Sequence, residues 1–123
     1  MPVPPPGYRS DERLAVYGSL APGKSNAHVL APLGGEWTEG VVHGHLRPIL
    51  SGAFAGYNII TLAADGPQVA CMLLSSHDLP GFWAELDAFE GPAYARVIAA
   101  VHVGDGVVEA NIYEDVERPA SDV

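Results

Sequence analysis

The sequence predicts an α+β fold, in which a mostly antiparallel sheet or small barrel carries helices at its mouth. Short apolar segments follow one another and are separated by glycine-containing turns, which is the pattern of successive β-hairpins. One segment, residues 79–90, instead has the apolar spacing of an amphipathic helix. With 123 residues and no internal repeat, the chain has the length of a single domain.

The expected elements can be placed in order along the chain. We expect strands over residues 13–18, 36–49, 57–63, 68–74, 94–103 and 107–113, and helices over residues 25–31 and 79–90. Pro32 ends the first, short helix. Residues 65–66 and 104–106 contain the Asp and Gly residues of hairpin turns. In the long strand expected over residues 36–49, Gly40 and Gly44 mark positions of a bulge or bend.

Both ends of the chain have the composition of tails. Residues 2–6 are rich in proline, and residues 114–123 are polar without any periodicity. We therefore expect a disordered N-terminal tail over residues 1–12, one domain over residues 13–114, and a C-terminal tail over residues 115–123.

Composition limits the partners and the compartment. The net charge is −9, with only six Lys and Arg, which argues against nucleic acid and anionic membranes as partners. No apolar run is long enough to span a membrane, and the N-terminus lacks the features of a secretory signal. Cys71 is the only cysteine and lies in an apolar run, so we expect a buried core thiol and a cytoplasmic protein. The oligomeric state cannot be read from the sequence.

The first chemical signal is an apolar strand that leads directly into Tyr17-Gly18-Ser19-Leu20. A glycine after a strand lets the backbone turn and bring successive N–H groups toward one point, which suits a carboxylate or a phosphate. Residues 18–25 also fit the nucleotide-binding pattern G-x-x-x-x-G-K-[ST]. That function needs a substantial helix after Lys24 and a parallel sheet, whereas Pro32 limits this helix to about two turns. A nucleotide-binding loop is therefore the less favoured alternative.

The second signal is an acidic residue on the apolar face of the helix over residues 79–90. With Asp78 as the expected N-cap, the apolar positions form one stripe, and Glu90 projects on the same side as Trp83 and Leu86. Glu85 falls outside the stripe and is expected to be exposed. Burial and the negative end of the helix dipole would raise the pKa of Glu90, as a general acid or base near neutral pH requires. The alternative is that Glu90, as the last helical residue, bends out to solvent.

Together, two motifs resemble the gamma-glutamyl cyclotransferase family. The first is Val16-Tyr17-Gly18-Ser19-Leu20, and the second is Leu86-Asp87-Ala88-Phe89-Glu90-Gly91, followed by Tyr94, Arg96 and two strands. The resemblance extends over about residues 13–114. It implies a gamma-glutamyl cyclotransferase-like fold, a small mixed, mostly antiparallel β-barrel with short flanking helices. It also implies a lyase or acyltransferase activity that cyclises a γ-glutamyl amine or amino acid and releases 5-oxoproline and the free amine.

The resemblance also assigns roles to residues. Glu90 corresponds to the catalytic acid–base residue, and Tyr17, Gly18, Ser19 and Leu20 to the loop that binds the glutamyl group through main-chain amides. Tyr94 either orients Glu90 or lines the substrate pocket, and the alternative is an ordinary core tyrosine. The alternative at the level of the whole protein is a non-catalytic module that binds small molecules on the same fold.

This chemistry requires neither a cofactor nor a metal, because the nucleophile is the α-amine of the substrate and one carboxylate can move both protons. The five histidines are scattered, and although His43 and His45 face alike on a strand, no third metal ligand is evident. Arg96 is expected to pair with a carboxylate, and Lys24 to be a solvated loop charge. The amine half of the substrate stays open: an amino acid, an amine, glutathione or an acyl chain of a biosynthetic pathway.

Overall fold

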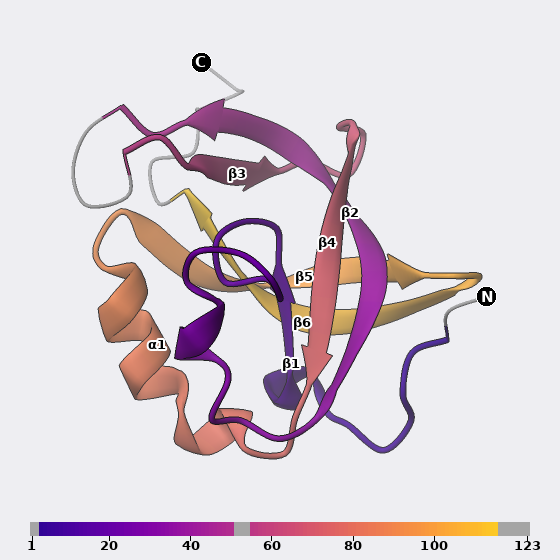
Figure 1. Ribbon diagram of the computed structural model, residues 1–123. Helices are drawn as coiled ribbons and strands as arrows, with labels where there is room; N and C mark the ends of the chain where they lie inside the picture. Colours follow the sequence, from indigo (N-terminus) through magenta and orange to yellow (C-terminus); the bar gives the residue numbers. More distant parts are fainter. Residues whose placement is uncertain (1–2, 51–54, 116–123) are drawn as a thin grey trace.

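The computed structural model describes residues 3–50 and 55–115 and contains a small barrel (Figure 1). Its strands are β1 (Arg13–Val16), β2 (Glu36–Pro48), β3 (Asn58–Leu62), β4 (Gln68–Ser75), β5 (Tyr94–Val103) and β6 (Gly106–Asp115). They pair in the order β3-β2-β4-β1-β6-β5, and β2 also pairs with β5, so five strands close a barrel and β3 is an extra strand. Among the described strands, only β1 and β6 pair in parallel. The predicted fold class, a small mixed and mostly antiparallel barrel, is confirmed.

Strand β2 closes the barrel because it is long enough to change partners along its length. Its first part pairs with β4 and its second part with β3, while Val41 lies opposite His102 of β5. Gly40 and Gly44 lie near these changes. A Cβ atom at Gly40 would be 2.9 Å from Cγ1 of Val101, and one at Gly44 would be 2.6 Å from the carbonyl oxygen of Thr61. Both glycines therefore permit close approach of neighbouring strands.

Two apolar clusters form the core. The first draws on all six strands and fills the barrel; its buried members are Ala15, Val42, Ile60, Val69, Cys71, Leu73, Ala99, Val101, Val103, Ala110 and Ile112. The second lies between the barrel wall and the helical side of the molecule; its buried members are Leu14, Val16, Leu20, Ala21, Leu30, Leu74, Leu79, Trp83, Leu86 and Tyr113. Neighbours such as Leu73 and Leu74 fall in different clusters because side chains alternate across a strand. Cys71 is buried, as predicted.

The two predicted helices are shorter than expected. Residues 79–90 divide into the 3₁₀ helix η3 (Leu79–Gly81) and the α-helix α1 (Trp83–Glu90). Pro80 and Gly81 have the lowest helix propensities, so the regular α-helix begins only after them. Asp78 does not cap the helix; its Oδ2 accepts a hydrogen bond from the N–H of Gly34 at 2.9 Å. No described helix is long and apolar enough to cross a membrane.

The helix predicted over residues 25–31 is reduced to one 3₁₀ turn, η2 (Ala27–Val29). Its hydrogen bonds are those of isolated turns, such as Val29 N–H to the Asn26 carbonyl and Leu30 N–H to the Ala27 carbonyl. A helix of two turns gains too few hydrogen bonds to offset the cost of nucleation. Burial of Leu30 in the second cluster therefore determines the conformation of this segment.

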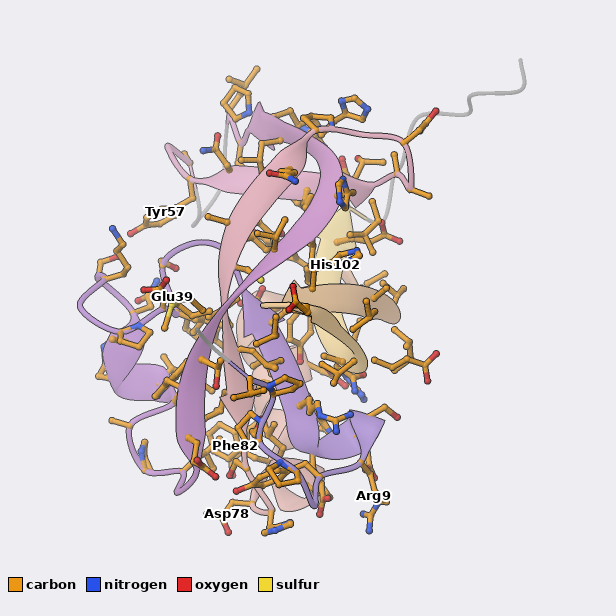
Figure 2. All side chains as sticks on the ribbon, turned by 90° about the vertical axis from the view of Figure 1, so that its right-hand side faces the viewer. Arg9, Glu39, Tyr57, Asp78, Phe82 and His102 are labelled. Atoms are coloured by element: carbon orange, nitrogen blue, oxygen red, sulfur yellow. The ribbon has the colours of Figure 1, made fainter. Side chains whose placement is uncertain are left out.

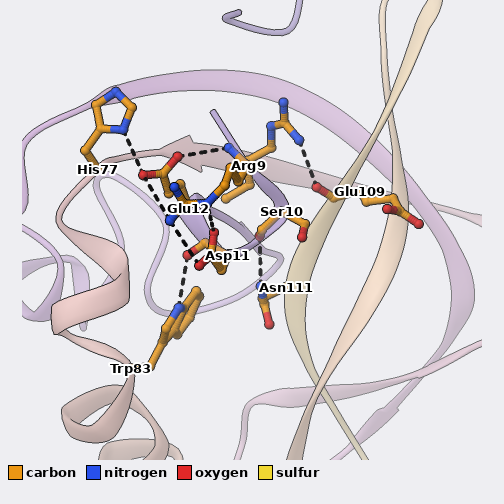
Figure 3. Close-up of polar contacts among 9 residues, drawn as sticks. Arg9, Ser10, Asp11, Glu12, His77, Trp83, Glu109 and Asn111 are labelled. Carbon is orange, nitrogen blue, oxygen red and sulfur yellow. Dashed lines mark hydrogen bonds and ion pairs between the residues drawn. The ribbon is translucent and has the colours of Figure 1, made fainter. Parts of the chain in front are cut away.

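At both ends, ordered structure extends beyond the predicted domain of residues 13–114. Residues Ser10–Glu12 form the 3₁₀ helix η1 and pack on the barrel (Figure 3). The Asn111 side chain donates to the Ser10 carbonyl at 2.9 Å, and the Trp83 indole donates to the Asp11 carbonyl at 3.0 Å. At the other end β6 includes Asp115, which is buried and pairs with Arg47. These long-range contacts leave no signal in local composition; residues 1–2 and 116–123 of the predicted tails lie outside the described residues.

Candidate active site

The loop after β1 leaves three successive backbone N–H groups available. Among the described residues, none accepts a hydrogen bond from the N–H of Gly18, Ser19 or Leu20. Ser19 forms hydrogen bonds through its other polar groups: its carbonyl accepts from the Asn26 N–H at 2.8 Å, and its hydroxyl accepts from the Asn26 side chain at 2.9 Å. The loop is thus held by its carbonyls and side chains, and its amides can bind an anionic or carbonyl oxygen.

The sequence predicts that Gly18 lets the backbone turn sharply after the strand, but the structure gives it another role. It does not adopt the left-handed backbone conformation, so it is not required for a sharp turn. A Cβ atom at this position would meet nothing within 4 Å. The absence of a side chain therefore leaves open space beside the loop, into which a ligand can approach the backbone.

Glu90 is buried at the end of α1. Its side chain shares the inward face with Trp83 and Leu86, whereas Glu85 is exposed. Glu90 is 9% exposed, which decides between the two alternatives for its position. Burial alone raises the pKa of Glu90 to about 7, and within the described part of the chain its carboxyl group has no hydrogen-bond partner. A group with this pKa is present in both its acid and its base form at neutral pH.

The loop and Glu90 lie around one small cavity of about 40 Å³. All six residues proposed from the sequence line it: Tyr17, Gly18, Ser19, Leu20, Glu90 and Tyr94. A space of this size suits a small polar ligand rather than a nucleotide. The structure therefore brings together the two motifs, which are about 70 positions apart in the sequence; their roles in chemistry stay predictions.

Sequence reasoning missed three polar side chains in the cavity lining: Tyr57, Asn58 and Tyr113. Tyr57 lies directly before β3, and Asn58 is the first residue of that strand; no sequence motif includes either residue. Tyr113 lies opposite Arg96 in the pairing of β5 and β6, so only the register of this hairpin could have indicated it.

Tyrosine hydroxyl groups fix the walls of the cavity. The Tyr17 hydroxyl donates to the Tyr113 carbonyl at 2.7 Å and accepts from the Ile60 N–H at 3.2 Å, which links β1, β3 and β6. Burial raises the pKa of Tyr17 above its usual range and, with the charge of Glu90 as the next cause, raises the pKa of Tyr94 to about 12. Both phenols consequently stay protonated near neutral pH.

Asp87 and Arg96, both part of the second motif, pair with each other in the structure. Arg96 donates to the Asp87 carboxylate at 2.9 and 3.3 Å and to the Asn111 side chain at 3.0 Å, and its guanidinium lies 4.4 Å from the Trp83 ring. The Tyr113 hydroxyl also donates to Asp87, at 2.7 Å. The hydrogen bond from Arg96, followed by the one from Tyr113, lowers the pKa of Asp87. The predicted pairing of Arg96 with a carboxylate is confirmed, and it anchors α1 to the β5–β6 hairpin.

The nucleotide-binding alternative does not fit the structure around Lys24. The loop leads into the single turn η2 rather than the N-terminus of an α-helix, and β1 has the antiparallel strand β4 on one side. The Ser25 hydroxyl, which would bind the metal of a nucleotide, lies 2.8 Å from the hydroxyl of Tyr57, beside the same loop (Figure 2). Within residues 3–50 and 55–115, no three His, Cys, Asp or Glu side chains are grouped as metal ligands.

Comparison with known proteins places this geometry in context. A profile of the family described as Gamma-glutamyl cyclotransferase, AIG2-like matches residues 14–121. Among solved structures, YkqA from Bacillus subtilis is 22% identical with a TM-score of 0.66, covering 85% of this chain and 36% of its own. An AIG2-like protein from Mus musculus is 17% identical (TM-score 0.64; 89% of this chain, 80% of that chain). A protein from Arabidopsis thaliana is 21% identical (TM-score 0.66; 90% and 72%).

At these identities the solved structures show a common fold. The chain spans just over a third of the length of YkqA but most of the length of the mouse and plant proteins. A search of curated protein sequences gave no match.

Proposed function

Because this chain belongs to the AIG2-like gamma-glutamyl cyclotransferase family, we propose that it is an enzyme that cyclises a γ-glutamyl compound to 5-oxoproline and releases the free amine. We assign this activity to the domain over residues 13–114 together with Ser10–Glu12, which pack on it. The observation that carries the proposal is the shared cavity. It combines a buried carboxyl group, Glu90, with a loop whose N–H groups have no acceptor among the described residues.

In the proposed reaction Glu90 moves both protons. As a carboxylate it takes a proton from the α-amine of the substrate, and this nitrogen attacks the γ-carbonyl carbon of the same glutamyl group. The tetrahedral intermediate then collapses: the bond to the departing nitrogen breaks, and Glu90 returns its proton to that nitrogen. A pKa of about 7 lets one residue accept and donate within a single turnover.

The cavity supplies the positioning that an intramolecular attack requires. Because nucleophile and electrophile belong to one substrate molecule, holding the glutamyl chain in a curled conformation lowers the barrier by several kcal/mol. The N–H groups of Gly18, Ser19 and Leu20 can bind the α-carboxylate or the carbonyl oxygen that becomes negatively charged. Tyr94 and Tyr113, both in the lining, narrow the space around these atoms.

We predict that Glu90→Gln folds normally but releases 5-oxoproline at least about 100-fold more slowly than the wild type, because the amide cannot accept a proton. The assay follows 5-oxoproline from a panel of γ-glutamyl amino acids, γ-glutamyl amines and glutathione. The wild-type rate is expected to rise with pH through about 7, where Glu90 ionises. Glu85→Gln, an exposed position on the same helix, is the matched control and is expected to keep the wild-type rate.

Two outcomes would contradict parts of this proposal. Full activity of Glu90→Gln would remove Glu90 from the chemistry. If 5-oxoproline raised the melting temperature of the wild type while no compound of the panel was turned over, the protein would be a non-catalytic binding module on the same fold.

A further inference from the structure

A second, larger hollow adjoins the cavity around Glu90. Its volume is about 990 Å³, and it extends over the outer faces of β2 and β4. Val16, Tyr17 and Gly18 line both spaces. Gly18 contributes no side chain there and a Cβ atom would meet nothing within 4 Å, so an elongated ligand can pass from one space to the other over this residue.

The floor of this groove is apolar and its surroundings are polar. Val41 of β2 lies opposite Ala70 of β4, and Met72 follows on the same face two residues later. Lys24 enters the groove from the loop after β1, and Glu39 from β2. The groove therefore offers an apolar surface to the body of a ligand, with the Lys24 ammonium group on the side of the loop and the Glu39 carboxylate on β2.

Lys24 is a cation that the proposed chemistry does not use. It is the only lysine of the chain. Among the described arginines, three are in ion pairs, and Arg13 donates to the carbonyl of Glu109. Lys24 alone among the described lysine and arginine side chains makes neither kind of contact, so its ammonium group is available to a ligand.

We propose that this groove binds the amine half of the substrate and that Lys24 pairs with a carboxylate on that half. This inference rests on the proposed function. The cavity around Glu90, about 40 Å³, is much smaller than the groove, so we place the glutamyl group in the cavity and the amine half of the substrate in the groove. The groove begins at Gly18 and presents Lys24 on the same loop. The preferred substrates are then γ-glutamyl amino acids with an apolar side chain, rather than γ-glutamyl derivatives of uncharged amines.

The test compares two compounds that differ in one group: γ-glutamyl-leucine and γ-glutamyl-3-methylbutylamine, which lacks only the leucine carboxylate. For the wild type we expect kcat/KM to be roughly 5-fold higher for γ-glutamyl-leucine, the upper range for a solvent-exposed ion pair. The preference is expected to fall at high salt. In Lys24→Met we expect the ratio of the two kcat/KM values to fall to about 1. In Lys24→Arg, which keeps the charge, we expect most of the preference for γ-glutamyl-leucine to remain.

A second pair of variants tests the groove itself. Ala70→Phe fills the floor of the groove and is expected to raise KM for both compounds. The control is Ala100→Phe, at an exposed alanine of β5 that lines neither the cavity nor the groove, and it is expected to leave KM unchanged. Equal ratios in the wild type and in Lys24→Met, or an Ala70→Phe variant that behaves like Ala100→Phe, would overturn this inference alone. If the wild type released 5-oxoproline from neither compound nor from any other γ-glutamyl compound, the proposed function would fail first.

Discussion

Glu90 places a carboxyl group among apolar side chains, and we expect this position to have opposite effects on the proposed activity and on stability. An ionised carboxylate without a hydrogen-bond partner in the described part of the chain lacks compensation for its lost hydration. The same lack of compensation raises its pKa to about 7, which is suitable for moving protons at neutral pH. A buried base is therefore expected to lower the stability of the fold that carries it.

We predict that Glu90→Gln is more stable than the wild type at pH 8 but not at pH 5. The folded pKa of Glu90, about 7, lies above its ordinary value of 4.5, so the folded state binds the proton more tightly than the unfolded state. Between these two values the stability of the wild type falls as pH rises, and a shift of this size corresponds to about 3 kcal/mol at most. Melting temperatures of the two proteins across pH 5–8 measure the difference. Parallel curves would show that Glu90 ionises normally in the folded protein.

At the scale of elements, the position of Glu90 depends on how α1 is attached to the barrel. The helix has only two turns and little stability of its own. Trp83 and Leu86 bury its inner face, and Arg96 binds Asp87 near its C-terminal end. The end of α1 that carries Glu90 is thus fixed by a bidentate ion pair to β5, which is the stronger kind of polar contact.

Arg96→Ala is expected to lower the free energy of unfolding by about 2 kcal/mol, because it removes this ion pair and leaves the buried Asn111 side chain without the Arg96 donor. Urea denaturation followed by fluorescence gives the value. The matched control is Arg9→Ala, which removes ion pairs of an exposed arginine with Asp11 and Glu12 and is expected to lower the urea midpoint less than Arg96→Ala. Similar midpoints for the two variants would mean that α1 is held mainly by its apolar face.

At the scale of the whole molecule, the N-terminal segment joins parts of the chain that are distant in sequence. Glu12 is buried, and its carboxylate accepts from the Arg9 N–H at 2.9 Å and contacts His77 at 3.0 Å (Figure 3). The carbonyl of Glu12 accepts from the Ser76 N–H at 2.8 Å. The segment before β1 is thereby attached to the connection between β4 and η3.

We predict that Glu12→Gln lowers the melting temperature at pH 7 and that this difference shrinks as the pH falls. The backbone hydrogen bond from Arg9, followed by the contact with His77, lowers the pKa of Glu12 below its ordinary value of 4.5. Ionised Glu12 therefore stabilises the fold above that value, and the stabilisation is lost as the pH falls through the lower, folded-state pKa. Glu109→Gln, at an exposed position of β6, is the control. A constant difference between pH 7 and pH 3 would assign the effect to packing rather than to charge.

The sequence determined the features that depend on local periodicity. Alternation and turn residues predicted each strand of the barrel to within a few positions, and helical spacing predicted that Glu90 shares the inward face of its helix with Trp83 and Leu86. Both signals arise because the backbone repeats every two or every 3.6 residues, whatever the rest of the chain does. The two motifs similarly identified the loop and the carboxylate that line the cavity.

How these elements meet depends on contacts that form only in the folded barrel. The pairing of Val41 with His102 closes the barrel, Asp78 binds Gly34 instead of capping a helix, and Ser10–Glu12 pack on the barrel instead of forming a tail. Tyr57 and Tyr113 enter the cavity through the positions of β3 and β6. Each of these results depends on contacts between residues far apart in the chain, whose free energy is gained only when the whole barrel closes, so no local pattern records them.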